Sequence, residues 1–151
     1  MNSIRGFWLG MKGVLRASRQ VINARLEPLG LSSLEGDLLF HLLTGGDQPH
    51  QEELAERLDI GKAAVSRAVD SLEEKGYVRR AQAPEDGRAR CVTLTDKARA
   101  ASAGIVGVYE TLYQIACAGV DEEELRRIGA VLARVAANLQ TLGGQECDWN
   151  S

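Results

Sequence analysis

The sequence predicts a mainly α-helical protein with one small β-hairpin, and three observations support this fold class. Apolar residues recur every three or four positions through most of the 151 residues, which is typical of helices. Only two short runs, at 77–80 and 90–94, are rich in β-prone residues, and Ala83–Gly87 between them has the chemistry of a turn. Directly before this hairpin, residues 50–76 predict a short helix, a tight turn and a longer helix.

The composition is that of an ordinary globular protein, with 44% hydrophobic and 26% charged residues. No apolar run approaches the roughly 18 residues that a membrane span needs, and the N-terminus does not resemble a signal peptide, so we expect a cytoplasmic protein with no membrane partner. The net charge of −3 argues against binding nucleic acid by bulk attraction. Residues 51–100 are neutral, with ten Lys/Arg and ten Asp/Glu, so the placement of the charges must decide what this region binds.

Two helices are predicted ahead of residue 50. The first runs from Ser3 to Glu27 and is stopped by Pro28. Ser32 and Glu35 then form a capping-box sequence, in which the serine caps the helix and the glutamate is expected to reach back to the cap. The second helix that starts here is rich in leucine and ends at the glycine pair 45–46.

Two more helices are predicted after the hairpin. Thr95 is expected to cap a helix from about Asp96 to Ala118, and the acidic run 121–124 caps the last helix. Apolar residues in that last helix are spaced 3, 4, 3, 4, 3, the pattern of a helix that meets another along its length. Packing within its own chain would explain this seam, but a homodimer is favoured because the terminal helices would otherwise expose apolar surface. The expected dimer interface comprises Ile4, Phe7, Leu125, Ile128, Leu132, Val135 and Leu139.

The longer helix before the hairpin has the two faces that a DNA major groove requires. One face carries a stripe of four aliphatic residues between 65 and 72, while Ala63, Ser66 and Arg67 lie on the other. Ser66 and Arg67 are therefore the main candidates for reading bases, because an arginine that bonds both O6 and N7 of guanine discriminates by roughly 1–3 kcal/mol. The alternative is that Arg67 pairs with Asp70 or Glu74 on a solvated helix face.

The hairpin is expected to add a second contact to such a duplex. Arg88 and Arg90 stand beside its tip and, two residues apart, point to the same side of the strand. Such a wing can place an arginine in the minor groove while the helix occupies the adjacent major groove. Gln51 and Lys62 lie near helix N-termini, where contacts to phosphate are favourable. Lys62, Arg67, Arg79, Arg80, Arg88 and Arg90 can all face one side.

Two tracts, LAERLDIGKAAVSRAVDSLEEKGYVRR and PEDGRARCVTLT, resemble the winged helix-turn-helix core of the MarR family of bacterial transcriptional regulators. The resemblance implies helical dimerisation arms at 1–30 and 97–143, a DNA-binding domain at 31–96 and a tail at 144–151. It also implies a homodimeric repressor that binds a palindromic site in double-stranded DNA and responds to a ligand.

The resemblance also assigns roles to single residues. Asp86 would steady the wing arginine, either Arg88 or Arg90. The implied DNA-contacting set is Gln51, Lys62, Ala63, Ser66, Arg67, Asp86, Arg88 and Arg90. Ala98 stands where the family often has glycine, and this alanine favours the helix that starts there.

The resemblance further implies a pocket for a small aromatic ligand between the arms and the DNA-binding domain. Its candidate lining is Trp8, Met11, His41, Tyr109 and Tyr113. Helical spacing explains the same residues as ordinary core, which is the favoured interpretation, and His41 is expected to be a satisfied, partly buried histidine or one that lines the cavity.

The remaining polar residues predict neither a metal site nor an enzyme. His41 and His50 form no His-x-x-x-His pair, no cofactor motif is present, and we find no catalytic constellation. Cys91, Cys117 and Cys147 lack metal-like spacing, and the first helix lacks the cysteine through which some relatives sense oxidants. Two alternatives stay open: a winged-helix protein-interaction module without DNA binding, and a cysteine redox-sensing regulator of the same family.

Overall fold

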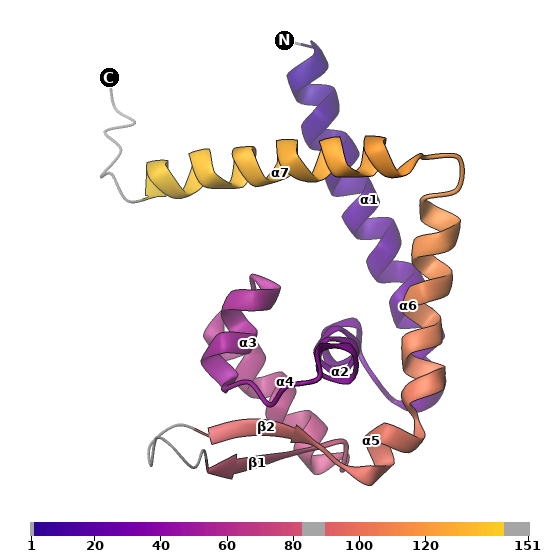
Figure 1. Ribbon diagram of the computed structural model, residues 1–151, viewed down its shortest axis with the longest axis vertical. Coiled ribbons are helices and arrows are strands. Elements are labelled where there is room, and N and C mark those ends of the chain that lie inside the picture. The colour runs from indigo at the N-terminus through magenta and orange to yellow at the C-terminus, as the bar shows by residue number, and fades with distance from the viewer. Residues whose placement is uncertain (1, 83–89, 144–151) are drawn as a thin grey trace. The chain divides into compact units, whose positions relative to one another are not determined.

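The computed structural model describes residues 2–82 and 90–143 (Figure 1) and confirms the predicted fold class. Two antiparallel strands are the only strands in these ranges, and all other regular elements are helical. The chain divides into two compact units, residues 1–113 and 114–151, which we describe separately. The elements are α1 (Asn2–Leu26), the 3₁₀ helix η1 (Glu27–Leu29), α2 (Ser33–Gly45), α3 (Gln51–Leu58), α4 (Lys62–Glu74), β1 (Val78–Gln82), β2 (Arg90–Leu94), α5 (Asp96–Ala100), α6 (Ser102–Ala116) and α7 (Glu122–Gly143).

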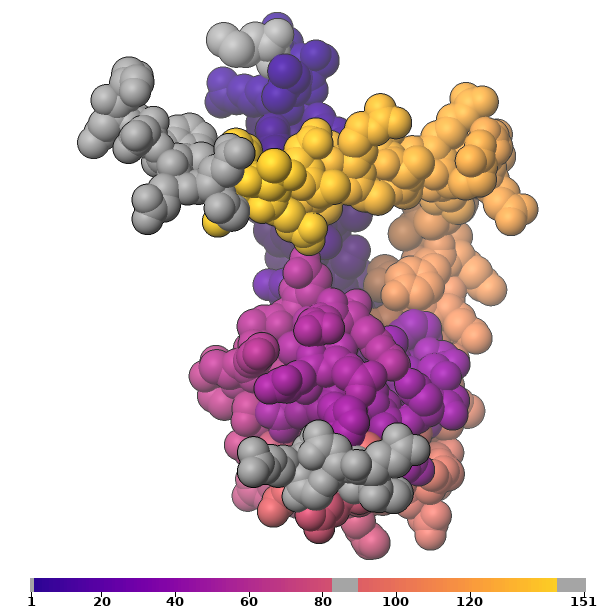
Figure 2. Space-filling model, turned by 60° about the vertical axis from the view of Figure 1, so that its left-hand side comes forward, coloured from indigo at the N-terminus to yellow at the C-terminus, as the bar shows by residue number. Residues whose placement is uncertain are grey.

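The first unit has its hydrophobic core where α2, α3, α4 and the hairpin meet. Helix α4 contacts α2, α3 and β1, and β2 pairs with β1 from Val78↔Leu94 to Gln82↔Arg90 (Figure 1). In the space-filling view the side chains of α2, α3 and α4 form one continuous body (Figure 2). The largest fully buried side chains are Tyr109, Leu26, Leu38, Leu39, Leu54, Leu72, Ile105, Val65, Val69, Val78, Val92 and Pro49. This packing gives the short helices α3 and α4 a rigid base.

Several local sequence signals act as predicted. The hydroxyl of Ser32 accepts a hydrogen bond from the backbone N–H of Glu35 at 3.2 Å, and the hydroxyl of Thr95 accepts one from the N–H of Ala98 at 3.3 Å. Gly76 has a φ of +84°, the left-handed conformation that favours glycine after a helix. These caps and the left-handed residue begin α2 and α5 and end α4.

Three predicted details are wrong. Helix α1 ends at Leu26, one residue early, because Pro28 is accommodated inside the 3₁₀ turn that follows. The side chain of Glu35 turns into the protein instead of reaching back to its cap. The helix predicted for 96–118 is divided at Ala101 (φ −86°, ψ 0°), the C-cap residue of α5, and its second part already ends at Ala116.

Helix α2 passes its neighbours at very close range at Gly36. A Cβ at this position would overlap the side chain of Leu26 on α1 and lie 2.7 Å from the hydroxyl of Tyr109 on α6. A hydrogen in place of a side chain therefore lets three helices of the first unit meet.

The second unit is dominated by α7. The side chain of Asp121 accepts a hydrogen bond from the N–H of Glu124 at 2.7 Å, and the carboxylate of Glu124 accepts one at 3.0 Å from the N–H of Asp121, so the predicted cap is confirmed. No residue of α7 is buried. Within residues 2–82 and 90–143, no helix combines the length and the apolar character needed to cross a membrane.

Candidate nucleic-acid interface

The turn between α3 and α4 fixes the start of α4. Asp59 adopts a left-handed conformation with φ +51°, and the N–H of Ile60 bonds the carbonyl of Ala55 at 3.0 Å. Gly61 then serves as the N-cap residue of α4. The chain thus reverses within three residues, as a helix-turn-helix requires.

The outward face of α4 is open along its first two turns. Lys62, Ala63 and Arg67 are exposed, and Ser66 is half-buried. Among the residues that the structure describes, none pairs with the guanidinium of Arg67. Asp70, one of the two acids that could have neutralised it, instead lies 2.6 Å from a nitrogen of Arg80. As far as the described residues are concerned, the Arg67 side chain is therefore free to bind another molecule.

Arg80 on β1 binds both helices of the helix-turn-helix, α3 and α4. Its guanidinium donates to the carboxylate of Glu73 at 3.2 Å and to the carbonyl of Ser66 at 3.3 Å, in addition to its ion pair with Asp70. Its Nε donates to the side chain of Gln51, the first residue of α3, at 3.2 Å. Only 14% of the Arg80 side chain is exposed. One arginine therefore joins α3, α4 and β1.

The expectation that Arg80 faces outward with the other cations is therefore wrong. Successive residues of a strand point to opposite faces, so Arg79 and Arg80 cannot both face out, and Arg79 is the exposed one. That alternation was present in the sequence, as were two acids on α4, Asp70 and Glu73, that can bind an inward-pointing guanidinium.

A second buried link fixes the C-terminal end of α4. The carboxylate of Glu35 on α2 accepts hydrogen bonds from Ser71 at 3.0 Å and from Lys75 at 2.7 Å. The ammonium of Lys75 also donates to the carbonyl of Gly30 at 2.7 Å. From Ser66 to its C-cap residue Lys75, α4 is thus tied to other elements by charged hydrogen bonds, which are stronger than neutral ones.

Gln51 and Lys62 each occupy the first position of a helix, α3 and α4 respectively. Lys62 is 74% exposed, and its Nζ lies 3.8 Å from a carboxylate oxygen of Glu52. Arg90 is exposed at the beginning of β2. Asp86 and Arg88, the other two predicted wing residues, lie outside the described residues.

The geometry is that of a winged helix-turn-helix, and the comparisons agree. The sequence profile of the MarR family matches residues 29–89. The uncharacterized HTH-type transcriptional regulator YdgJ of Bacillus subtilis (strain 168) is 34% identical over 129 residues, which cover 85% of this chain and 78% of that one. The crystal structure of the transcriptional regulator PA3341 is 35% identical, covers 89% of this chain and 98% of its own, and superposes with a TM-score of 0.78.

The chain belongs to the MarR family and is a DNA-binding transcriptional regulator. A putative MarR family transcriptional regulator from Listeria monocytogenes, solved in complex with a 26mer DNA, shares the fold with a TM-score of 0.80. It is 21% identical and covers 94% of this chain and 97% of its own.

The predicted ligand-pocket residues lie on three helices. Trp8 and Met11 are on α1, His41 is on α2, and Tyr109 and Tyr113 are on α6. Trp8 meets a neighbouring ring edge-on, with 6.0 Å between centroids. The expectation that His41 is satisfied is wrong, because its Nε2 is buried without a hydrogen-bond partner among the described residues.

Sequence reasoning missed two residues that contact Tyr109, namely Phe40 and Asp37. Phe40 stacks on Tyr109 with 4.4 Å between ring centroids and meets Tyr113 edge-on. Asp37 accepts a hydrogen bond of 2.7 Å from the Tyr109 hydroxyl. Burial raises the pKa of the Asp37 carboxyl, and the hydrogen bond from Tyr109 and the charge of Arg19 oppose this only in part. The sequence did contain a signal for this contact, because Asp37 is an acid inside a leucine-rich helix, one turn before Phe40.

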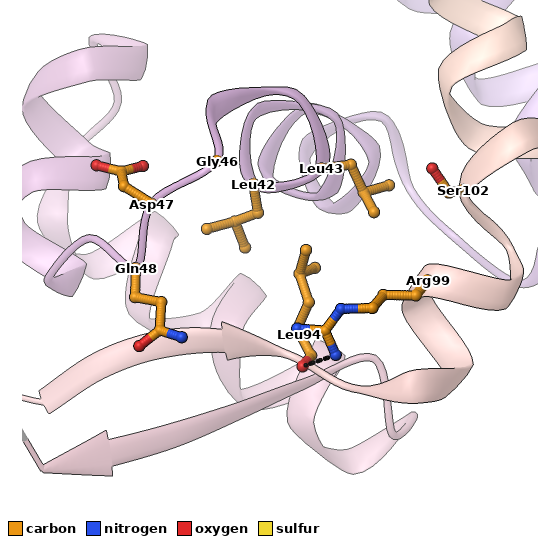
Figure 3. A pocket seen from close by; sticks show the side chains of 8 residues that line it. All are labelled: Leu42, Leu43, Gly46, Asp47, Gln48, Leu94, Arg99 and Ser102. Carbon is orange, nitrogen blue, oxygen red and sulfur yellow. Dashed lines mark hydrogen bonds between the residues drawn. The ribbon is translucent and has the colours of Figure 1, made fainter.

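A different set of residues lines a cavity of about 370 Å³ in the first unit (Figure 3). Leu42 and Leu43 of α2 face Leu94 at the end of β2, and Arg99 of α5 donates a hydrogen bond of 3.1 Å to the carbonyl of Leu94. The full lining is Leu42, Leu43, Gly46, Asp47, Gln48, Leu94, Arg99 and Ser102. None of the predicted ligand residues is among them.

Proposed function

We propose that this protein is a homodimeric repressor that reads a palindromic DNA site with the N-terminal half of α4. The observation that carries the proposal is the open face of α4, where Arg67 has no partner among the described residues while Asp70 is occupied by Arg80. A cation on a firmly held helix can bond guanine in the major groove. The DNA complex of the Listeria protein with the same fold supports this use of the surface.

Contacts to DNA are divided between reading and positioning. Ser66 and Arg67, with Ala63 leaving room beside them, read base edges. Lys62 and Gln51 bind phosphate at the N-termini of α4 and α3. The wing, with Arg88, Arg90 and Asp86, binds the adjacent minor groove. The neutral charge of residues 51–100 predicts weak non-specific binding, so two half-sites are needed for tight binding.

The dimer uses the helical arms, with Ile4 and Phe7 of α1 and the seam of α7. Ile4, Leu125, Ile128, Leu132 and Leu139 are all exposed, which supports their use as an interface. A twofold dimer places two α4 helices roughly 34 Å apart, one turn of the duplex. Residues 1–30 and 97–143 are the arms, and residues 31–96 the DNA-binding domain.

The repressor is released when a small aromatic ligand changes the separation of the two α4 helices. Trp8, Met11, His41, Tyr109 and Tyr113 are the proposed ligand residues, and the ring cluster around Tyr109 supports an aromatic partner. Titration with phenolic ligands, metals and oxidants tests this step. A DNA affinity that is the same with every one of them would contradict it.

Selection of bound duplexes from a random DNA pool at a stated salt concentration tests the main proposal. We expect a palindrome with half-sites about one helical turn apart. Arg67→Ala and Arg88→Ala should each lower the affinity for that site about tenfold or more. Arg134→Ala, which removes an exposed arginine of α7 instead, should leave it unchanged. No enrichment of any sequence, or equal affinity of all variants, would favour a protein-interaction module.

A further inference from the structure

Cys91 on β2 is one of three reactive side chains in contact at the start of α3. Its Sγ lies 3.8 Å from Nδ1 of His50, the N-cap residue of α3. Nε2 of the same imidazole lies 3.7 Å from a carboxylate oxygen of Glu53. A thiol, an imidazole and a carboxylate thus lie in series, and a base beside a thiol is the arrangement used to activate cysteine nucleophiles.

The backbone holds these groups in place. His50 and Cys91 form an isolated antiparallel bridge, and the N–H of Val92 donates to the carbonyl of Pro49 at 3.0 Å. The carboxylate of Glu53 also accepts a hydrogen bond of 3.2 Å from the N–H of His50. The three side chains therefore come from two segments that are joined by main-chain hydrogen bonds.

The thiol is within reach of small molecules. Cys91 is half-buried, and 34% of the His50 side chain is exposed. Cys117 serves as the internal control for the reactivity of Cys91, because its side chain is half-buried as well. Among the described residues, none donates or accepts a side-chain hydrogen bond at the Cys117 sulfur. The two cysteines therefore differ in the base beside them.

We propose that Cys91 is a site of covalent modification by α,β-unsaturated carbonyl compounds, and that the adduct weakens DNA binding. The thiol proton moves to Nδ1 of His50, and the sulfur forms a bond to the β-carbon of the electrophile. The electron pair of the C=C bond moves onto the α-carbon and carbonyl as an enolate, which then takes a proton back from the imidazolium, directly or through water. The product is a thioether, and no oxidant, reductant or second cysteine takes part.

The effect on DNA binding rests on the proposed function. The residue after His50 is Gln51, which accepts the hydrogen bond from Nε of Arg80. Arg80 in turn holds Asp70 and the carbonyl of Ser66 on α4. A group added to Cys91 separates β2 from the first turn of α3. It therefore disturbs the same network that positions the proposed DNA-reading face.

N-ethylmaleimide, an α,β-unsaturated dicarbonyl, serves as the probe on the full chain, and peptide mass spectrometry gives the modification rate at each cysteine. We expect Cys91 to react about tenfold or more faster than Cys117. His50→Asn keeps a good N-cap residue but removes the base, so it should slow Cys91 about tenfold and leave Cys117 unchanged. If His50 were only structural, its loss would loosen the site and speed up Cys91. Equal rates at the two cysteines, or no slowing in His50→Asn, would overturn the proposal.

DNA binding by the modified protein is then measured on the selected duplex. The adduct should lower affinity about tenfold or more in the wild type, while Cys91→Ser treated in the same way should bind as before. An adduct at Cys91 that leaves the affinity unchanged would contradict the regulatory half of the proposal. If the unmodified protein binds no DNA, the proposed function fails instead, and the rate comparison still decides the thiol chemistry.

Discussion

Arg80 shows how much of the DNA-binding domain depends on one side chain. Its guanidinium meets the carboxylates of Asp70 and Glu73 and the amide oxygen of Gln51. An arginine presents its donors in a fixed fork, so it can serve three acceptors on two helices at once. The polar sides of α3 and α4 are therefore held together through this guanidinium, while their apolar sides share the core.

Arg80→Met should lower the free energy of unfolding by about 1–3 kcal/mol, because charged hydrogen bonds are lost and two acids are left close together. Urea unfolding followed by circular dichroism measures the change. Arg79→Met is the matched control, since Arg79 is exposed on the opposite face of the strand, and it should change stability by less than about 0.5 kcal/mol. Equal effects of the two substitutions would show that Arg80 does not hold the helices.

The buried side of α4 was predictable from the sequence because aliphatic periodicity records which residues avoid water. The partners of individual polar side chains were not. Glu35 was assigned to its own helix cap, yet Lys75 and Ser71 lie within bonding distance once α2 packs on α4. Such a choice depends on residues 36 to 40 positions apart, which no local pattern records.

At the scale of elements, the contact of α2 with α6 has a polar bond inside an aromatic cluster. The Tyr109 hydroxyl donates to Asp37, and Phe40 stacks on the same ring. Burial raises the pKa of both the Asp37 carboxyl and the Tyr109 hydroxyl. The bond therefore couples helix packing to the protonation of one carboxyl.

The raised pKa of Asp37 predicts a fall in stability as the pH rises above its usual value of 3.8. Above that pH the unfolded chain releases the proton first, so the native state binds more protons and loses stability until the raised pKa is passed. Asp37→Asn keeps an acceptor for Tyr109 but does not titrate. Urea unfolding across this pH range should show a smaller decline in Asp37→Asn than in the wild type. An identical decline in both proteins would contradict the prediction.

Element boundaries followed the sequence where a single residue sets them, as at Ser32, Gly76 and Thr95. The boundaries differed from the prediction where no single residue marks the end of a helix. Nothing in the helical pattern of residues 96–118 marks Ala101, since alanine favours a helix. The sequence therefore predicts one helix where the structure has two, α5 and α6.

At the scale of the whole molecule, the apolar surface of the arms favours a dimer. Trp8, Val14 and Leu15 on α1 are exposed, as are Leu125, Ile128, Leu132, Leu139 and Leu142 on α7. The spacing of apolar residues in α7 is enough to predict this seam. Periodicity alone, however, cannot distinguish a partner helix of the same chain from one of a second copy.

Leu132→Glu should weaken self-association about tenfold or more, because each copy would bury a charge at the centre of the seam. Analytical ultracentrifugation over a range of concentrations measures it. Ala130→Glu places the same charge on the same helix away from the seam and should leave the association unchanged. A Leu132→Glu protein that sediments as the wild type does would show that the seam is not the interface.

The close packing at Gly36 constrains which amino-acid substitutions this protein can accept. Even a methyl group there would force both the Leu26 side chain and the Tyr109 hydroxyl to move. A larger residue at position 36 is therefore expected to be tolerated best together with smaller side chains at positions 26 and 109. Three positions on α1, α2 and α6, far apart in sequence, thus share one limited volume.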